Sequence, residues 1–310
     1  MQIWMIALIV IACVVAFLAL LVFGGALLAV NIVLGRRSRE ASNVFSDKYG
    51  IDLGWFDEVK DRTETIEIVA YDGIKLRALH IKHEDGAHRV AVLQHGYCAS
   101  PRAMQPYAKI LFDKGYDVVM PSARAHGMSE GRYIGMAWLD RFDLSRWVKR
   151  VIEIYGESVK IAVMGVSMGG AAVVALAGMQ PPPQVKCVID DCGFSSQREI
   201  FYSCVRKAPL PKRLCVMPLA LGIRLKCGYS YLDADIVPFA QKTDIPALFI
   251  HGTADAFVPC EHGKKLYEAC GSSDKSIYLV EGAEHVAAYS HDKEEYKKRL
   301  SEFVDRTVGE

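Results

Sequence analysis

The chain has 310 residues, and its 37 lysines and arginines nearly balance its 36 acidic residues, which gives a formal net charge of +1 at pH 7. This balance leaves no basic excess for a nucleic-acid surface, so we expect no nucleic-acid partner. Without residues 1–35, which are described next, the remaining length is enough to bury one large core.

Residues 1–35 differ in kind from the rest of the chain, because they include no charged residue and no histidine. The apolar run within them is interrupted only by Gly24, Gly25 and Asn31. Since about 20 apolar residues cross a bilayer, this run predicts one transmembrane helix over 1–35. A cleaved signal peptide is the alternative, but it requires a basic start and a shorter apolar stretch.

The charges after this run indicate on which side of a membrane the rest of the chain lies. Arg36, Arg37 and Arg39 follow directly, whereas no basic side chain precedes the run. Basic residues stay on the cytoplasmic side, so we expect a single-pass membrane protein whose folded domain faces the cytoplasm. Eight of the nine cysteines lie beyond residue 35 without the spacing of a disulfide framework or a zinc site. This usage is typical of reduced thiols, and we expect no metal.

After a polar connector over residues 36–62, strand and helix patterns alternate to the end of the chain. Two alternating segments joined by Asp72-Gly73 predict a hairpin, and Ser100, as N-cap, and Pro101 predict the start of the first helix after it. The predicted strands are 65–71, 74–82, 89–96, 116–121, 160–164, 185–190, 245–252 and 276–282, and the predicted helices are 100–114, 138–156, 171–179 and a last one from about 294. A hairpin followed by this alternation predicts an α/β fold with a mostly parallel central sheet and helices on both faces.

The stretch MGVSMGG, residues 164–170, places a serine between glycines where an apolar strand meets an apolar helix. The spacing of Gly165, Ser167 and Gly169 matches G-x-S-x-G, the pattern of a nucleophile elbow. A tight turn in which the serine only caps the helix is the alternative. Sites in parallel sheets lie beyond the carboxyl ends of the strands, and Ser167 lies at such an end.

A serine nucleophile needs a base, and the base needs an orienting acid. His285, in EGAEHVAAY after the last predicted strand, is the candidate base. Asp255, in IHGTADAFVP, is the candidate acid, and Asp190 and Asp191 at the end of the preceding strand are the alternatives. The order Ser167, Asp255, His285 is the order described for α/β-hydrolases.

The oxyanion that forms during acyl transfer needs backbone donors fixed in advance. Met168 directly follows the serine at the start of a helix, where amides are unpaired and the dipole favours negative charge. The second donor is expected in LQHGYCASP, after the third strand, with Tyr97 as the first candidate and Cys98 as the alternative.

These motifs together resemble the α/β-hydrolase superfamily over about residues 63–308, in particular its serine aminopeptidase or monoacylglycerol-lipase-like branch with an N-terminal membrane anchor. The stretches that carry the resemblance are His95-Gly96, ARAHGMS at 123–129, GVSMG at 165–169, HGTADAFVP and GAEH. The family commonly reads D-x-R-G-H-G-x-S after its fourth strand, where this chain has Ser122 and Ala125 in the Asp and Gly places. Arg124 and His126 match the motif, and we interpret them as scaffold residues.

The resemblance also implies an insertion that forms a short cap, here at about residues 195–235, within a hydrolase domain of residues 63–310. Between residues 196 and 230 this segment carries seven basic residues and one acid, Glu199. The basic residues are Arg198, Arg206, Lys207, Lys212, Arg213, Arg224 and Lys226. They form either a solvated helical face or a basic, apolar cap that rests on anionic lipid or admits an anionic or acyl substrate.

The sequence therefore predicts a membrane-anchored serine hydrolase that cleaves carboxylic esters of small or lipid-like molecules through an acyl-enzyme, with no cofactor. A peptidase or thioesterase on the same triad is the enzymatic alternative, because substrate choice depends on the shape of the pocket. A non-catalytic membrane protein with the hydrolase fold is the other alternative.

Overall fold

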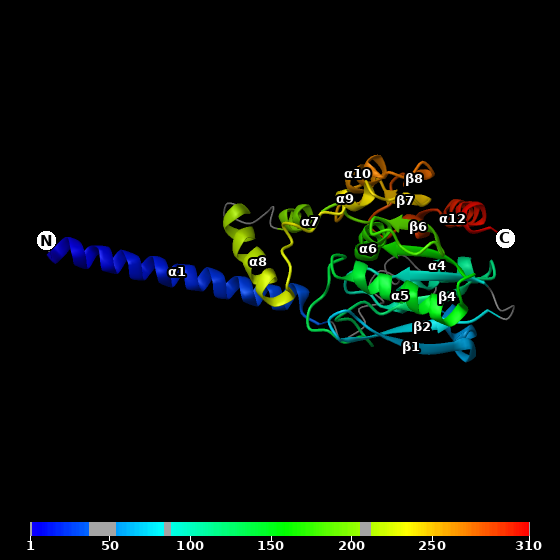
Figure 1. Cartoon of the computed structure of the whole chain (residues 1–310). Helices are drawn as coiled ribbons and strands as arrows, with labels where there is room; N and C mark the ends of the chain where they lie inside the picture. The colour runs from blue at the N-terminus through cyan, green and yellow to red at the C-terminus, as the bar shows by residue number, and fades with distance from the viewer. Residues whose placement is uncertain (1, 37–53, 84–87, 205–211, 310) are drawn as a thin grey trace. The chain divides into compact units, whose positions relative to one another are not determined.

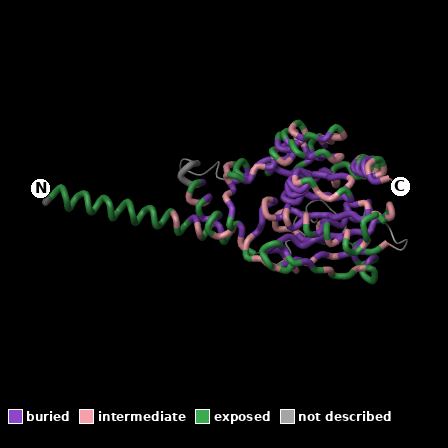
Figure 2. Tube along the Cα trace, viewed as in Figure 1, coloured by how far each residue is buried: buried purple, intermediate pink, exposed green. Residues whose placement is uncertain are grey.

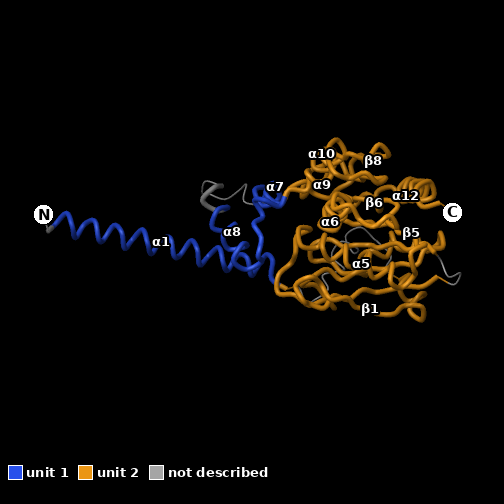
Figure 3. The backbone as a smooth tube through the Cα atoms, in the orientation of Figure 1, with its two compact units in different colours: residues 1–35, 197–234 blue, residues 36–196, 235–310 orange. Residues whose placement is uncertain are grey.

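The structure is a computed structural model that describes residues 2–36, 54–83, 88–204 and 212–309. The chain divides into two compact units (Figure 3). The larger unit comprises residues 36–196 and 235–310, and the smaller unit comprises residues 1–35 and 197–234. The predicted cap therefore groups with the first helix, and the predicted division at residues 35 and 62 stays a prediction.

An eight-stranded sheet forms the centre of the larger unit (Figure 1). Its strands are β1 (Thr63–Val69), β2 (Lys75–Ile81), β3 (Arg89–Gln94), β4 (Asp117–Pro121), β5 (Lys160–Val166), β6 (Val185–Asp191), β7 (Ala247–Gly252) and β8 (Lys275–Val280). They lie in the order β1-β2-β4-β3-β5-β6-β7-β8, with β2 antiparallel to both of its neighbours and the strands from β4 to β8 mutually parallel. The predicted hairpin and the mostly parallel sheet are confirmed.

Helices pack on both faces of this sheet. The helices are α4 (Gln105–Phe112), α5 (Asp140–Tyr155), α6 (Met168–Ala177), α9 (Val237–Ala240), α10 (Glu261–Ala269), α11 (Ala288–His291) and α12 (Lys293–Val308). Helices α4 and α12 share one apolar cluster with alternate strand residues such as Leu93 and Met164, while α5 and α6 contact each other. Because both faces are covered, the central strands are buried along nearly their whole length (Figure 2).

The helix predicted over 100–114 begins differently from the prediction. Residues Pro101–Met104 form a short 3-10 helix, η2, and α4 begins at Gln105. Pro101 and Pro106 each stand in a first helical turn, where the missing N–H costs nothing. The Ser100 hydroxyl is buried without a hydrogen-bond partner among the described residues, so it does not act as the predicted cap.

The predicted connector over 36–62 is folded at its end. Residues Trp55–Glu58 form α3, and Lys60–Arg62 form a 3-10 turn, η1. The Trp55 ring packs on Phe112 with centroids 5.4 Å apart, and the Phe56 amide donates to Gln105 Oε1 at 2.9 Å. These two aromatic side chains are therefore buried in the core, although they lie before residue 63.

The smaller unit contains α1 (Gln2–Leu34), α7 (Gln197–Cys204) and α8 (Lys212–Cys227). Within the described residues, α1 is the one helix long and apolar enough to cross a membrane, and most of its length is exposed (Figure 2). Helix α8 packs on the last third of α1, where Lys226 Nζ donates to the carbonyl of Leu27 at 3.0 Å and to Asn31 Oδ1 at 2.7 Å. Several predicted connector and cap residues lie outside the described residues, namely Arg37, Arg39, Arg206 and Lys207, and so do the side chains of Lys212 and Arg213.

Candidate active site

Ser167 occupies a sharp turn between β5 and α6, with φ 56° and ψ −114°. Such a conformation is costly for a residue with a side chain and persists only where its surroundings enforce it. A Cβ atom at Gly165 would lie 2.2 Å from the backbone of Gly169, and one at Gly169 would lie 2.1 Å from the carbonyl oxygen of Gln94. The two glycines of the G-x-S-x-G pattern therefore allow close packing that no other residue permits at this turn.

A chain of hydrogen bonds links the serine to a histidine and an aspartate far away in the sequence. Ser167 Oγ lies 2.9 Å from His285 Nε2, and His285 Nδ1 lies 2.6 Å from Asp255 Oδ2. The other carboxylate oxygen of Asp255 accepts from the amides of Phe257 and Val258, at 2.9 and 2.8 Å. Since the carboxylate accepts from Nδ1, the lone pair of Nε2 faces the serine hydroxyl, which is the tautomer that a general base requires.

A second histidine, His251 at the end of β7, also approaches this carboxylate. Its Nε2 lies 3.5 Å from Asp255 Oδ2 and 2.8 Å from the carbonyl oxygen of Val258. Burial alone would raise the pKa of Asp255, but hydrogen bonds from His251 and His285 hold that pKa well below its usual range. Asp255 is therefore ionised in the folded protein. Sequence analysis assigned His251 no role, although it lies in the same HGTADA stretch as the acid.

The two alternative acids have other partners. Asp190 Oδ1 accepts from the amide of Gly193 at 2.9 Å, and Asp191 Oδ2 accepts from the Tyr296 hydroxyl at 2.7 Å. Burial raises the pKa of Asp190 to about 7, so about half of this carboxyl group is neutral near pH 7. A neutral carboxyl group is poorly suited to stabilise an imidazolium, and Asp255 is the better placed acid.

Two backbone amides, those of Met168 and Tyr97, are the predicted donors to an oxyanion beside Ser167. Met168 is the first residue of α6, so its amide has no partner within the helix. The loop after β3 passes beside the serine, because a Cβ atom at Gly96 would lie 3.3 Å from the Ser167 Cβ. The amide of Cys98, the alternative donor, instead donates to His126 Nε2 at 3.1 Å. This contact directs the Cys98 amide to the scaffold, and Tyr97 stays the predicted loop donor.

Arg124 and His126 hold the loops beneath the site. The buried Arg124 guanidinium donates to both oxygens of Asp143 at 2.7 Å and to Asp72 at 2.9 Å, so it ties the loop after β4 to α5 and to the hairpin turn. His126 accepts from the Cys98 amide through Nε2, and its Nδ1 lies 3.0 Å from the carbonyl of Arg124. These contacts agree with the interpretation of both residues as scaffold.

The neighbouring His95 is also structural. Its Nε2 accepts from the amide of Ala123 at 3.0 Å, and its Nδ1 donates to the carbonyl of Gly96 at 2.8 Å. Burial lowers the pKa of His95 to about 3, so the ring is neutral.

The structure accommodates the two departures from the family motif. Ala125 has φ 60°, where glycine would be unstrained, and Ser122 Oγ donates to the carbonyl of His126 at 3.0 Å.

A second buried serine–histidine contact lies outside this chain of hydrogen bonds. Ser195 Oγ lies 2.9 Å from His262 Nδ1, and the Ser195 amide also points at this nitrogen, at 3.3 Å. The carbonyl of Ser195 accepts from the amide of Ile236 at 2.9 Å. Ser195 therefore joins the two ends of the segment that leads into and out of the cap, and it lies at no strand-to-helix elbow.

The thiol of Cys192 lies close to the acid and the base. Its sulfur and the donor atoms of Asp255 and His285 all lie within 4.8 Å of one another. Burial raises the pKa of the Cys192 thiol well above its usual value, so the thiol keeps its proton. A metal would need the thiolate and would also compete with the hydrogen bond between His285 and Asp255, so this group does not fit a metal ligand set.

Comparison with known proteins places the chain among hydrolases. A family described as serine aminopeptidase, S33, matches residues 85–208 and 221–292. The chain is 26% identical to a thermostable monoacylglycerol lipase of Bacillus sp. strain H-257, over 70% of this chain and 91% of that protein. It is 25% identical to the protein YqkD of Bacillus subtilis, over 80% of this chain and 81% of that one.

Solved structures show the same fold. An esterase of Pyrococcus furiosus superimposes with a TM-score of 0.68 at 24% identity, covering 89% of this chain and 99% of the esterase. An acylaminoacyl peptidase of Pyrococcus horikoshii superimposes with a TM-score of 0.58 at 17% identity, covering 80% of this chain and 42% of the peptidase. The family match covers well over half of the chain. The chain has the α/β-hydrolase fold and belongs to the serine aminopeptidase (S33) family of serine hydrolases.

Proposed function

We propose that the protein is a membrane-anchored hydrolase that cleaves carboxylic ester bonds, with Ser167 as nucleophile, His285 as base and Asp255 as orienting acid. The observation that carries this proposal is the continuous hydrogen-bond chain from Ser167 Oγ through both nitrogens of His285 to Asp255 Oδ2. A serine hydroxyl is inert near neutral pH unless such a base removes its proton.

In the proposed mechanism, Ser167 Oγ attacks the carbonyl carbon of the ester while His285 Nε2 takes the hydroxyl proton. The imidazolium is stabilised by ionised Asp255, and the amides of Met168 and Tyr97 donate to the oxyanion. His285 then gives the proton to the departing alcohol, which leaves an acyl group on Ser167. Water, deprotonated by His285, attacks this acyl-enzyme, and His285 returns the proton to Ser167 Oγ as the acid is released.

Lipid-like esters are the proposed substrates because the chain combines its hydrolase unit with a long apolar helix and is similar to a monoacylglycerol lipase. A peptidase is the second candidate, favoured by the family description and by the fold shared with an acylaminoacyl peptidase. Parallel assays of acyl esters of increasing chain length and of aminoacyl anilides separate the two: hydrolysis of anilides but not of esters would establish the peptidase.

Replacement of Ser167 by alanine tests the nucleophile. We expect Ser167→Ala to abolish labelling by a fluorophosphonate probe and to lower ester turnover by about six orders of magnitude. Folding should be retained, because a small side chain becomes smaller. The matched control is Ser195→Ala, which removes the other buried serine hydroxyl in contact with a histidine. Labelling that survives in Ser167→Ala and disappears in Ser195→Ala would transfer the role to Ser195.

The membrane anchor is part of the same proposal. Helix α1 carries no charge from Gln2 to Leu34, and a helix of this length extends about 50 Å, which exceeds the hydrocarbon thickness of a bilayer. We propose that it spans the membrane once and that the three arginines after it keep the hydrolase unit in the cytoplasm.

A further inference from the structure

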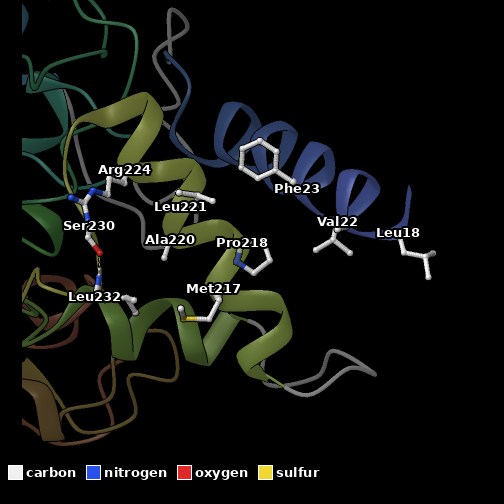
Figure 4. A pocket seen from close by; sticks show the side chains of 11 residues that line it. Leu18, Val22, Phe23, Met217, Pro218, Ala220, Leu221, Arg224, Ser230 and Leu232 are labelled. Carbon is white, nitrogen blue, oxygen red and sulfur yellow. Dashed lines mark hydrogen bonds between the residues drawn. The ribbon is translucent and has the colours of Figure 1, made fainter. Parts of the chain in front are cut away.

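Helices α1 and α8 of the smaller unit form the walls of a groove of about 690 Å³ (Figure 4). Leu18, Val22 and Phe23 line it from α1, and Met217 and Leu221 line it from α8. Its volume lies within the range of sites that bind small molecules, about 300–1,000 Å³. The lining is apolar except for two residues, Arg224 and Ser230.

The helices that form this groove expose apolar side chains to their surroundings. On α8, Met217, Leu221 and Leu225 follow one another at intervals of four residues and are 59%, 48% and 63% exposed. This spacing places them on one side of the helix. Contiguous exposed apolar surface is rare on proteins that face only water, so we infer that this side of α8 faces lipid, as α1 does.

The position of the groove along α1 places it at a membrane boundary. About 20 residues cross the hydrocarbon core, so the stretch from Ile3 to Phe23 is long enough to span it. From there α8 covers the helix: Ala26 and Val30 are buried, and a Cβ atom at Gly222 would lie 3.1 Å from Val30 Cγ2. The groove lies where the lipid-covered part of α1 ends and the part covered by α8 begins, on the side from which Arg36 follows.

Arg224 supplies a cation at the groove. Its side chain is exposed and has no ion pair among the residues that the structure describes, whereas the nearby Lys226 is held by the backbone and side chain of α1. An unpaired guanidinium beside an apolar groove complements a molecule that has an acyl chain and an anionic head. On the cytoplasmic side of a membrane, the abundant molecules of this kind are anionic phospholipids.

We propose that this groove binds one acyl chain of an anionic phospholipid from the cytoplasmic leaflet, with Arg224 pairing with the lipid phosphate. The inference rests on the membrane anchor and orientation proposed above, and it does not depend on the reaction that Ser167 performs. The bound lipid would fill the space between α1 and α8 and hold α8 at the membrane surface.

Native mass spectrometry of the full chain in detergent micelles tests this site. Phosphatidylglycerol and phosphatidylcholine with the same acyl chains are titrated separately, and we expect one phosphatidylglycerol per chain to be retained preferentially. Arg224→Gln should reduce this preference by about fivefold, the effect of one basic residue near a lipid surface. The matched control is Arg198→Gln, which removes an exposed arginine of α7 that does not line the groove and should leave the preference unchanged.

A second pair of variants tests the groove itself. Ala19→Trp places an indole in the groove from the lipid-facing side of α1 and should abolish retention. Ala12→Trp adds the same ring on the same side of α1 about two turns away, outside the groove, and should have no effect. Phosphatidylglycerol with a photoreactive acyl chain should crosslink to α8 near Met217 in the unmodified chain and not in Ala19→Trp.

Equal retention of both phospholipids, or retention that neither Arg224→Gln nor Ala19→Trp changes, would refute the site. Displacement of bound lipid by oleate, with no preference for phosphatidylglycerol, would identify a free fatty acid as the occupant and would also overturn the proposal. All measurements are repeated in Ser167→Ala protein. Loss of hydrolysis with lipid retention intact would then show that this site and the proposed reaction succeed or fail separately.

Discussion

The carboxylate of Asp255 is held by two backbone amides on one oxygen and approached by two imidazoles at the other. Amides fix the direction of the carboxylate, and the imidazoles favour its charged form. His285 is therefore oriented by an acid that cannot easily rotate or take up a proton. Of the four groups, His251 acts on the base only through Asp255, so we regard it as a positioning residue.

Replacement of Asp255 by asparagine should lower ester turnover by about 10⁴-fold, because an amide that donates to His285 would favour the wrong imidazole tautomer. Steady-state kinetics on a short soluble ester measure this effect. Asp190→Asn and Asp191→Asn serve as comparisons and should reduce turnover much less. If either of them is the more damaging change, the acid belongs to the end of β6.

The buried carboxyl group of Asp190 makes stability depend on pH. Burial raises its folded-state pKa to about 7, whereas the ordinary pKa of an aspartate is 3.8. Between these values the folded state holds a proton that the unfolded state has lost, so the free energy of unfolding falls as pH rises. The asparagine in Asp190→Asn is uncharged at every pH, so this substitution should reduce the change in the free energy of unfolding with pH.

Thermal unfolding of the full chain in detergent micelles at pH 5 and pH 8 measures this change. The control is Asp113→Asn, which removes an exposed carboxylate paired with Lys109 and should leave the difference between the two midpoints unchanged. A difference that Asp190→Asn does not reduce would mean that Asp190 is ionised in the folded protein.

At the scale of the elements, the central strands were predictable because they are short apolar runs, and a run buried on both faces needs no periodicity to be recognised. The elbow was predictable because G-x-S-x-G joins two such elements. Other features depend on contacts that a linear pattern does not contain. Trp55 and Phe56 stand in a mixed, polar stretch, and their contacts with α4 are between residues far apart in the sequence. In the sequence, His251 is only the end of a predicted strand. Its imidazole approaches Asp255 because the chain turns between the two residues.

Arg124 joins three elements of the larger unit, since it binds Asp143 of α5 and Asp72 of the hairpin turn from the loop after β4. Arg124→Gln should destabilise the protein by about 3–5 kcal/mol, because it leaves the buried Asp143 without its cation. Chemical denaturation monitored by tryptophan fluorescence measures this change. Arg299→Gln breaks an exposed pair with Glu295, and its cost should stay below about 1 kcal/mol. Similar effects of both substitutions would contradict a structural role for Arg124.

At the scale of the whole molecule, the chain combines a hydrolase unit with a smaller unit in which the cap segment and α1 belong together. Apolar length and the absence of charge predicted the helix, and the resemblance to the α/β-hydrolases implied the cap insertion. Their association was not predictable, because the contacts between Gly222 and Val30 join residues nearly two hundred positions apart. The nature of the substrate was equally beyond the sequence, since motifs fix the reacting groups and not the shape around them.

The orientation of the hydrolase unit can be tested with reporters fused after Glu310. A phosphatase that is active only outside the cytoplasm should be silent there, and a fluorescent protein that matures in the cytoplasm should fluoresce, because Arg36 and the two arginines after it favour the cytoplasmic side. Exchange of these three arginines for glutamine should weaken the bias. Strong phosphatase activity in the unmodified fusion would reverse the orientation.

The close approach of Gly222 to Val30 has a consequence for how such a protein can be rebuilt or can evolve. A membrane anchor that only tethers can be exchanged for any apolar helix, but α1, the proposed anchor, also packs closely on α8. Grafting a foreign anchor, or truncating the chain at residue 36, would leave α8 with its buried side unmatched. Helix α1 and the insertion should therefore be inherited as one module, and a functional chimera would need to take both from the same parent.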